Sequence, residues 1–399
     1  MSVKPRLPVT PMLGSAMFMC GVTFASSQPY HAVVGIEALG LTSGQFALVM
    51  SLGSIIGAMI AVAIGYISDR LRDRRVLVLL TAAAGAGGFA LIYLVRTPWM
   101  FAVSIGMIVP LGMGMYSQTF SYVRVYYDAI SPERSRFMVS AMRTVFTIAW
   151  VIIPPAVGYV AAVYSTFDVY LVAALAYALA GLVFAVLMTD PLTRIAPQSI
   201  PRKKEGAAFI SLPWPVASGL AGILVINVAM RLASLAMPLM IITQLGGSLA
   251  DVGIYAGIAA AVEIPFMLLW GHLLSRFSRE DIIVGNALLF GAYLVLVSNA
   301  ASVTDVYWLQ ALNGISTAAL MSIPISYMQD TIKGRVGLSS SLMDVMNVSA
   351  ALLGAASFGI LASQQDYGWA LAVAGVLGVG GGLVMLIGNF RKPRLTADP

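Results

Sequence analysis

Residues 65–75, GYISDRLRDRR, separate two apolar segments of the chain and place four arginines within six residues. Each flanking segment is about 20 residues long, the length that an α-helix needs to cross the hydrocarbon core of a bilayer. Basic residues beside such segments collect on the cytoplasmic side of the membrane. The stretch therefore predicts two membrane helices joined by a cytoplasmic loop.

The same charge pattern continues along the chain, because basic residues cluster at both ends and in every second loop, whereas the six opposite loops carry only Arg96. We therefore expect a multi-pass membrane protein with both termini in the cytoplasm. The basic clusters hold 20 of the 23 lysines and arginines: Lys4, Arg6, Arg70, Arg72, Arg74, Arg75, Arg124, Arg134, Arg136, Arg194, Arg202, Lys203, Lys204, Arg276, Arg279, Lys333, Arg335, Arg391, Lys392 and Arg394.

Composition supports this interpretation. Apolar residues make up 59% of the chain and charged residues 10%, against roughly 45–50% and about 25% in soluble domains. The net charge of +6 does not indicate a nucleic-acid partner, because the cations flank membrane segments. The single cysteine, Cys20, excludes a disulfide framework and a cysteine-based metal site, and we interpret it as a packing residue.

Apolar runs predict an all-α membrane protein with twelve transmembrane helices. The longest connection, 190–212, contains three prolines and the cluster Arg202, Lys203 and Lys204. We expect it to link an N-terminal six-helix bundle, 1–189, to a C-terminal one, 213–399. The predicted helices are 9–36, 44–67, 76–95, 99–122, 137–161, 167–189, 213–242, 249–274, 282–300, 304–328, 337–362 and 367–390.

The two halves resemble each other. Gly-Tyr-Ile-Ser-Asp-Arg at 65–70 is matched by Gly-His-Leu-Leu-Ser-Arg at 271–276, 206 residues later. Both preceding helices carry small residues every fourth position, which lets another helix approach closely: Gly53, Gly57, Ala61 and Gly65 in one, and Gly253, Gly257 and Ala261 in the other. Such repeats predict pseudo-symmetric bundles with a substrate site near the bilayer midplane.

Residues 65–75 resemble the loop Gly-x-Leu-x-Asp-Arg-x-Gly-Arg-Arg/Lys of the major facilitator superfamily, with Arg72 in place of the second glycine. The helix 137–161, with Met142-Arg143 and Ala149-Trp150-Val-Ile-Ile-Pro154-Pro155-Ala-Val-Gly158, resembles the bacterial sugar efflux transporters of that superfamily. Val262-Glu263-Ile264-Pro265 and Gly334-Arg335-Val-Gly337 extend this resemblance. It implies the major facilitator fold and gating roles for Gly65, Asp69, Arg70, Arg74, Pro154, Pro155, Gly158 and Pro265.

Two charges lie inside apolar segments at matching depths. Arg143 is seven residues beyond Arg136, and Glu263 is eight residues before Gly271, which is roughly 10 and 12 Å into the membrane. The resemblance implies that their helices face each other, so we expect an ion pair that couples protons to transport, with Asp344 as a second carboxyl. Alternatively, Arg143 reaches the cytoplasmic surface, Glu263 is a protonated, internally bonded group, and Asp344 pairs locally.

Hydrogen-bonding and aromatic residues in the predicted helices suit a sugar. Arg231 offers a fork of donors for hydroxyls or an anionic group, although a structural partner in the first helix is an alternative. Each of the others could equally be a packing contact. The candidate substrate-binding residues are Gln28, Tyr30, Tyr116, Gln118, Trp150, Asn227, Arg231, Asn313 and Asn347.

No motif of an enzyme or of a nucleotide-binding site occurs, and His31 and His272 are predicted on opposite membrane sides, so they cannot share a metal. We expect a monomeric exporter of sugars or similar small molecules in the bacterial inner membrane. It would work by alternating access and proton antiport, driven by the proton gradient without a cofactor. A drug/proton antiporter and a membrane-embedded sensor without net transport are alternatives.

Overall fold

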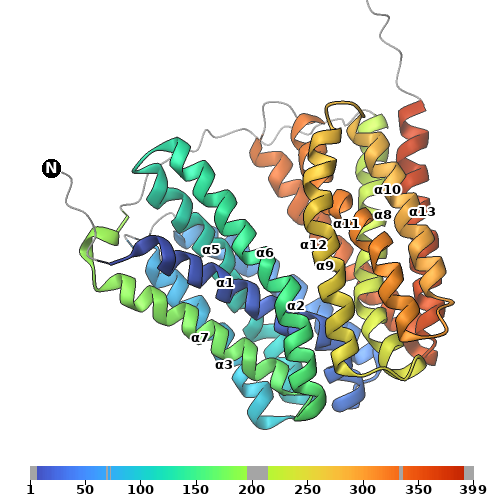
Figure 1. The fold of residues 1–399 in the computed structure, drawn as a ribbon, viewed down its shortest axis with the longest axis horizontal. Coiled ribbons are helices and arrows are strands. Elements are labelled where there is room, and N and C mark those ends of the chain that lie inside the picture. Colours follow the sequence, from blue (N-terminus) through green and yellow to red (C-terminus); the bar gives the residue numbers. More distant parts are fainter. Residues whose placement is uncertain (1–6, 69–70, 72, 196–213, 332–335, 391–399) are drawn as a thin grey trace, which may run out of the picture. The chain divides into compact units, whose positions relative to one another are not determined.

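The computed structural model describes residues 7–68, 71, 73–195, 214–331 and 336–390. Contacts divide the chain into two units. The first unit is Met1–Arg202 with Gly246–Gly257, and the second is Lys203–Leu245 with Ile258–Pro399. Since the bilayer offers no hydrogen bonds, a chain of this composition must satisfy its backbone internally, and the described part of the chain is accordingly built from helices (Figure 1).

The described residues of the first half form six long helices. Helix 1 continues from α1 through a 3₁₀ turn, η1, into a π-helical segment, η2, and helix 4 likewise contains a π-helical segment, η3. The bounds are α1 (Val9–Ser27), η1 (Gln28–Tyr30), η2 (Val33–Ala38), α2 (Ser43–Ser68), α3 (Arg75–Val95), α4 (Pro98–Val103), η3 (Ser104–Ile108), α5 (Val109–Asp128), α6 (Pro132–Val163), α7 (Asp168–Met188) and the short turn η4 (Pro191–Thr193).

The second half supplies helices 7 to 12. Among the described residues, eleven helices are long and apolar enough to cross a membrane. The remaining one, α11, has 29 residues but carries more polar side chains, Gln310 and Asn313 among them. The bounds are α8 (Trp214–Leu239), η5 (Met240–Gln244), α9 (Leu249–Leu273), α10 (Arg279–Val297), α11 (Val303–Thr331), α12 (Val336–Leu361), η6 (Ala362–Gln364) and α13 (Tyr367–Phe390).

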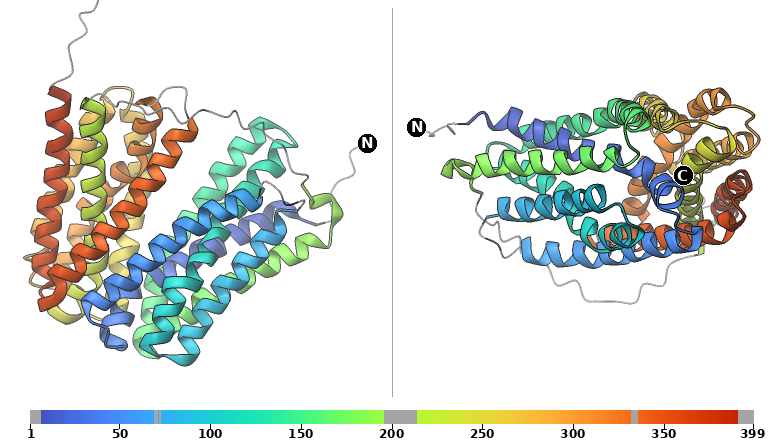
Figure 2. Two further views of the ribbon diagram at one scale, coloured as in Figure 1. Left: turned by 180° about the vertical axis from the view of Figure 1, so that it is seen from behind. Right: turned by 90° about the horizontal axis from the view of Figure 1, so that it is seen from below.

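Helix packing repeats between the halves. In the first, α7 packs against α1 and α3, α6 against α1, and α5 against α3. In the second, α13 packs against α8 and α10, α12 against α8, and α11 against α10. Counted along the chain these are the same helix pairs, and Figure 2 shows α8 and α13 side by side. The predicted fold of two pseudo-symmetric six-helix bundles is therefore confirmed.

The repeat keeps an offset of 206 residues at several landmarks. Gly40 and Gly246 both adopt a left-handed conformation, with φ of 72° and 64°, and each follows a π-helical segment. In this register, however, Gly253 corresponds to Ala47 and Gly257 to Ser51. The small-residue stripes of α2 and α9 therefore occupy different positions in the two copies, contrary to the match expected from their spacing.

Small residues bring helices into close contact inside each half. A Cβ on Gly85 of α3 would lie 2.5 Å from the Tyr177 ring of α7, and one on Gly112 of α5 would lie 2.5 Å from the Cα of Gly85. In the second half, a Cβ on Gly222 of α8 would lie 2.5 Å from the carbonyl oxygen of Gly381 in α13. Such backbone approaches supply the packing that holds membrane helices together.

We expect Gly85→Ala to lower the midpoint of thermal unfolding in detergent, because the added methyl overpacks the α3–α7 contact at a cost of about 1–3 kcal/mol. Gly87→Ala is the matched control in the same helix, since no described atom lies within 4 Å of its Cβ position. The control gains helix propensity without a clash. Equal stability of the two variants would contradict the packing role of Gly85.

Candidate functional site

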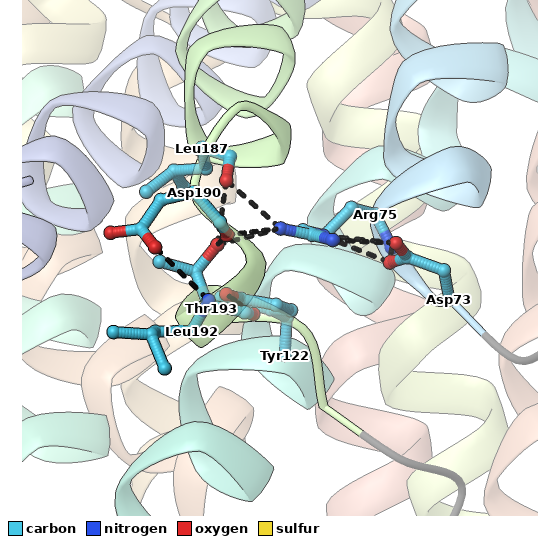
Figure 3. A network of polar contacts seen from close by, with 7 residues as sticks. All are labelled: Asp73, Arg75, Tyr122, Leu187, Asp190, Leu192 and Thr193. Carbon is cyan, nitrogen blue, oxygen red and sulfur yellow. Dashed lines mark hydrogen bonds and ion pairs between the residues drawn. The ribbon is translucent and has the colours of Figure 1, made fainter. Parts of the chain in front are cut away.

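A network of polar contacts closes the predicted cytoplasmic end of the first unit around Arg75, the first residue of α3. Arg75 is only 3% exposed. One side of its guanidinium faces the Asp73 carboxylate, with Nη2 2.7 Å from Oδ2 and Nε 2.9 Å from Oδ1. On the other side, Nη1 donates to the carbonyl oxygen of Leu187 at 2.9 Å and to Thr193 Oγ1 at 2.6 Å (Figure 3).

The end of α7 provides these acceptors. The last carbonyls of a helix lack partners within it, and Leu187 O accepts both from Arg75 and from the Thr193 hydroxyl, the latter at 2.6 Å. The Asp190 side chain accepts from Leu192 N at 3.0 Å and so caps η4. Tyr122 of α5 donates its hydroxyl to Thr193 O at 2.6 Å. The ends of α3, α5 and α7 are thereby tied together.

Electrostatics favour the charged form of Asp73. Burial by itself raises the pKa of this carboxyl, but the hydrogen bonds and positive charge of Arg75 outweigh burial and hold the pKa below its ordinary value. The charge of Arg194 acts in the same direction. A buried charge is costly unless it is paired, and Asp73 supplies the countercharge to the Arg75 guanidinium.

The sequence analysis did not single out Asp73 and Arg75, the two residues at the centre of this polar network. Arg74, predicted as a gating residue, donates from Nη1 to Ser121 Oγ of α5 at 2.7 Å. Asp69 and Arg70 lie outside the described residues, and Gly65 has no described atom of another segment within 4 Å of its Cβ position. Asp73 and Arg75 were readable only as an acid two residues before an arginine, which did not indicate a buried pair.

Tyr30, predicted to bind substrate, takes part in helix packing. It is fully buried, and its hydroxyl donates to Pro154 O of α6 at 2.7 Å. A Cβ on Gly158 would lie 2.6 Å from that hydroxyl oxygen, so the glycine makes room for the contact. The helix α6 runs unbroken through Pro154 and Pro155, and this proline–glycine segment therefore holds helix 1.

An aromatic cluster surrounds Tyr116 of α5 in the first unit. Its ring centroid lies 4.7 Å from Phe146, 4.8 Å from Phe120 and 6.1 Å from Phe24. The sequence analysis did not include these three phenylalanines in the predicted site, although they lie on the same helices as residues that it did include. Tyr116 remains half-buried, so the cluster presents a phenol and ring edges at an accessible position.

The other predicted residues of the first unit differ in accessibility. Gln28 and Arg143 are exposed and Trp150 is half-buried. Arg143 is close enough to Tyr116 to interact with its phenol electrostatically. Gln118 is 6% exposed, and its Oε1 has no hydrogen-bond partner among the described residues. A buried acceptor without a donor carries a desolvation cost.

Amide groups in the second unit form a short chain. Asn313 donates to Gln310 Oε1 at 2.7 Å, and Gln310 donates to the Tyr293 hydroxyl at 3.0 Å. Gln310 is fully buried, whereas Asn313 is half-buried. The predicted residue Asn313 is therefore held in place by Gln310 and Tyr293, which sequence analysis did not single out.

The remaining polar candidates of the second unit lie on α8, α9 and α12. Arg231 is exposed and Asn227 half-buried on α8, and Gly354 of α12 packs directly on Arg231, since a Cβ there would lie 2.6 Å from the Arg231 Cβ. Glu263 is half-buried in α9, which continues helically through the exposed Pro265, and Asp344 and Asn347 are exposed on α12. Because Arg143 belongs to the first unit and Glu263 to the second, their pairing stays a prediction.

In the described part of the chain, no group of three or more histidine, cysteine or acidic residues lies close enough together to hold a metal ion. The arrangement consists instead of polar and aromatic side chains distributed over membrane helices. Such a distribution suits binding of a small solute rather than catalysis.

Comparison with protein families identifies one relationship across the chain. The family model described as Major Facilitator Superfamily matches residues 12–230 and again 219–398. Together the two matches cover nearly the whole chain, one for each half.

Individual relatives extend over similar lengths. The chain is 24% identical over 380 residues to a "Putative sugar efflux transporter" of Deinococcus radiodurans, covering 95% of this chain and 97% of that protein. It is 28% identical over 340 residues to "Sugar efflux transporter A" of Dickeya chrysanthemi, covering 82% of each. It is 25% identical to "Sugar efflux transporter A" of Escherichia coli, covering 90% and 92%.

Solved structures share the architecture. The nucleoside transporter NupG superposes with a TM-score of 0.76 at 12% identity, over 97% of this chain and 100% of that one. A POT family transporter in complex with a thioalcohol-conjugated peptide gives a TM-score of 0.74 at 13% identity, over 94% and 95%. At these identities the likeness concerns the fold.

The charge of Asp73 should stabilise the protein only above acidic pH. Its contribution is complete above the pKa of the unfolded carboxyl, near 3.8, and is lost as the pH falls through the lower pKa of the folded state. We therefore expect Asp73→Asn to lower the thermal midpoint at neutral pH, and the gap to wild type to narrow in acid. Asp128→Asn is the control, because Asp128 lies 3.8 Å from an exposed Arg124. A gap independent of pH would contradict the charge pairing.

Proposed function

The chain belongs to the major facilitator superfamily, and from this premise we propose that it exports sugars or sugar-like solutes by proton antiport. The observation that carries the proposal is the similarity to three named sugar efflux transporters over 82–95% of the chain. The chain is a multi-pass membrane transporter rather than an enzyme. The bacterial inner membrane, cytoplasmic termini and a monomeric state are part of the proposal.

Side chains accessible in each unit support a sugar as substrate. A sugar presents hydroxyls that need hydrogen-bonding partners and apolar faces that stack on aromatic rings. The first unit offers Tyr116 within its aromatic cluster. The second offers Asn313, fixed by Gln310, and the half-buried Asn227 with Arg231 one turn away. A preorganised amide loses less entropy on binding than a mobile one.

Proton coupling is assigned to Glu263, with Asp344 as a second carboxyl and Arg143 as the cation that competes for Glu263. A carboxyl within a membrane segment is costly when charged, so its protonation can respond to the presence of a cation or a substrate. Exchange of this proton with one side of the membrane and then the other would couple export to the proton gradient. No cofactor is required by such a cycle.

We expect sugars to compete for binding to the purified protein and lipophilic cations not to compete. Asn227→Ala and Asn313→Ala should each weaken sugar binding by about 1 kcal/mol, the scale of a lost hydrogen bond. Asn299→Ala is the matched control, because the Asn299 side chain bonds only to Val295 and Ser298 beside the α10 terminus in the described structure. Tight binding of a lipophilic cation without sugar competition would instead identify a drug/proton antiporter.

A second measurement separates coupling from binding. In proteoliposomes, Glu263→Gln should abolish proton-driven export while counterflow without a proton gradient partly survives, and Arg143→Ala should act in the same direction. Glu37→Gln is the control, since Glu37 is an exposed glutamate at the end of helix 1. Full activity of both Glu263→Gln and Arg143→Ala would refute the coupling role, and absence of counterflow in the wild type would favour a sensor.

A further inference from the structure

The Arg75 network differs between the two copies of the internal repeat. The 206-residue offset that relates Gly65 to Gly271 also relates Gly85 to Gly291, so it applies on both sides of the loop. Within this register Asp73 corresponds to Arg279 and Arg75 to Asp281. The acid and the arginine have exchanged places.

Each unit consequently anchors its loop to a different helix. In the second unit Arg279, at the start of α10, pairs with Asp330 near the end of α11 at 2.5 Å, and the two side chains are 39% and 54% exposed. Asp281 accepts from Ser278 Oγ at 2.6 Å within the same turn. In the first unit the pair is formed inside the loop, where the Arg75 and Asp73 side chains are 4% and 17% exposed.

This difference in burial sets the strength of the two anchors. An exposed ion pair contributes about 0–1 kcal/mol, because water screens it and the side chains lose entropy. A buried guanidinium that loses its partners leaves both a charge and several acceptors unsatisfied, which is far more costly. We therefore expect the contacts of Arg75 between α3 and the end of α7 to contribute more free energy than the ion pair of Arg279 between α10 and α11.

Helix packing explains why the polar contacts of Arg75 lie at the start of α3 and the end of α7. Inside the membrane α3 and α7 are already joined where Gly85 meets Tyr177 and where a Cβ on Gly181 would meet Ala82 at 3.2 Å. Beyond these contacts the chain leaves α7 through η4, and polar contacts continue the attachment between the helices. Arg75 spans the gap to Leu187 and Thr193, and Tyr122 adds α5 through Thr193 O.

We propose that Arg75 is a positioning residue for transport, which makes the cytoplasmic ends of helices 3 and 6 move as one body during the cycle. This inference rests on the proposed transport function. Asp73 balances the charge of Arg75 from within the same loop. The carbonyl oxygen of Leu187 and the hydroxyl of Thr193 accept the hydrogen bonds that attach Arg75 to the end of α7. Because Arg75 lies at the start of α3 and is not among the residues assigned to sugar binding, its loss should slow turnover and leave substrate affinity unchanged.

The test compares Arg75→Met with Arg279→Met, its counterpart in anchoring, by hydrogen–deuterium exchange and by sugar counterflow. Arg75→Met should raise exchange at residues 187–193 by about tenfold or more, because this segment then opens locally, and should reduce the maximal counterflow rate by a similar factor with KM within about twofold. Arg279→Met should leave both nearly unchanged. Thr193→Val, which removes one acceptor, should show a smaller effect and provides a variant if Arg75→Met fails to fold.

Exchanging the charges at positions 73 and 75 tests whether the ion pair alone is sufficient or whether the hydrogen bonds of Arg75 to the end of α7 are also needed. The double variant Asp73→Arg, Arg75→Asp restores opposite charges in the order of the second unit, but an aspartate at position 75 cannot donate to Leu187 O. It should therefore remain slow, whereas Arg75→Lys should recover part of the rate. Recovery in the double variant, or wild-type exchange and turnover in Arg75→Met, would overturn the inference. If the wild type moves no sugar, the proposed function fails, while the exchange measurement still decides whether the anchor exists.

Discussion

The absence of hydrogen-bonding solvent inside a bilayer is the constraint on which this structure depends. Every backbone amide and carbonyl at membrane depth must find a partner in the chain, and only helices achieve this within a single segment. The helices of the described residues, their lengths and the position of most charges at their ends follow from this constraint. Even the irregular parts obey it, since η2, η3 and η5 are π-helical turns that keep their backbone bonded rather than open loops.

Without a strong hydrophobic drive between helices, their association depends on how closely backbones approach. Glycine makes this approach available where α3 meets α5 and α7 and where α8 meets α13. The same helix pairs recur in both halves, which indicates that packing geometry is what the internal repeat preserves. One point at which the sequence is also preserved is the pair of left-handed glycines, Gly40 and Gly246, where the backbone itself is constrained.

Electrostatics at the helix ends follow a different rule from packing. The repeat retains the arginine–acid anchors in both units but reverses their order and changes the helix that each one holds. A charge at a helix end can be satisfied by any nearby acceptor, so selection can change its partner without changing the fold. The corresponding helix ends of the two units are therefore held by ion pairs that differ in burial, with side chains 4% and 17% exposed in the first unit and 39% and 54% exposed in the second.

The sequence by itself determined the helix count, the orientation signals and the two-fold repeat, because hydrophobic length and charge position are properties of the chain read one segment at a time. Arg143, Glu263 and Arg231 were likewise visible as charges in apolar runs. Only the tertiary structure decided the partners. The sequence did not indicate that the Tyr30 hydroxyl donates to Pro154 O. It also did not indicate that the Arg75 guanidinium lies between Asp73 and the end of α7. Partners 112 or 124 residues apart are brought together by helix packing, which depends on shape complementarity between segments and leaves no local pattern in the sequence.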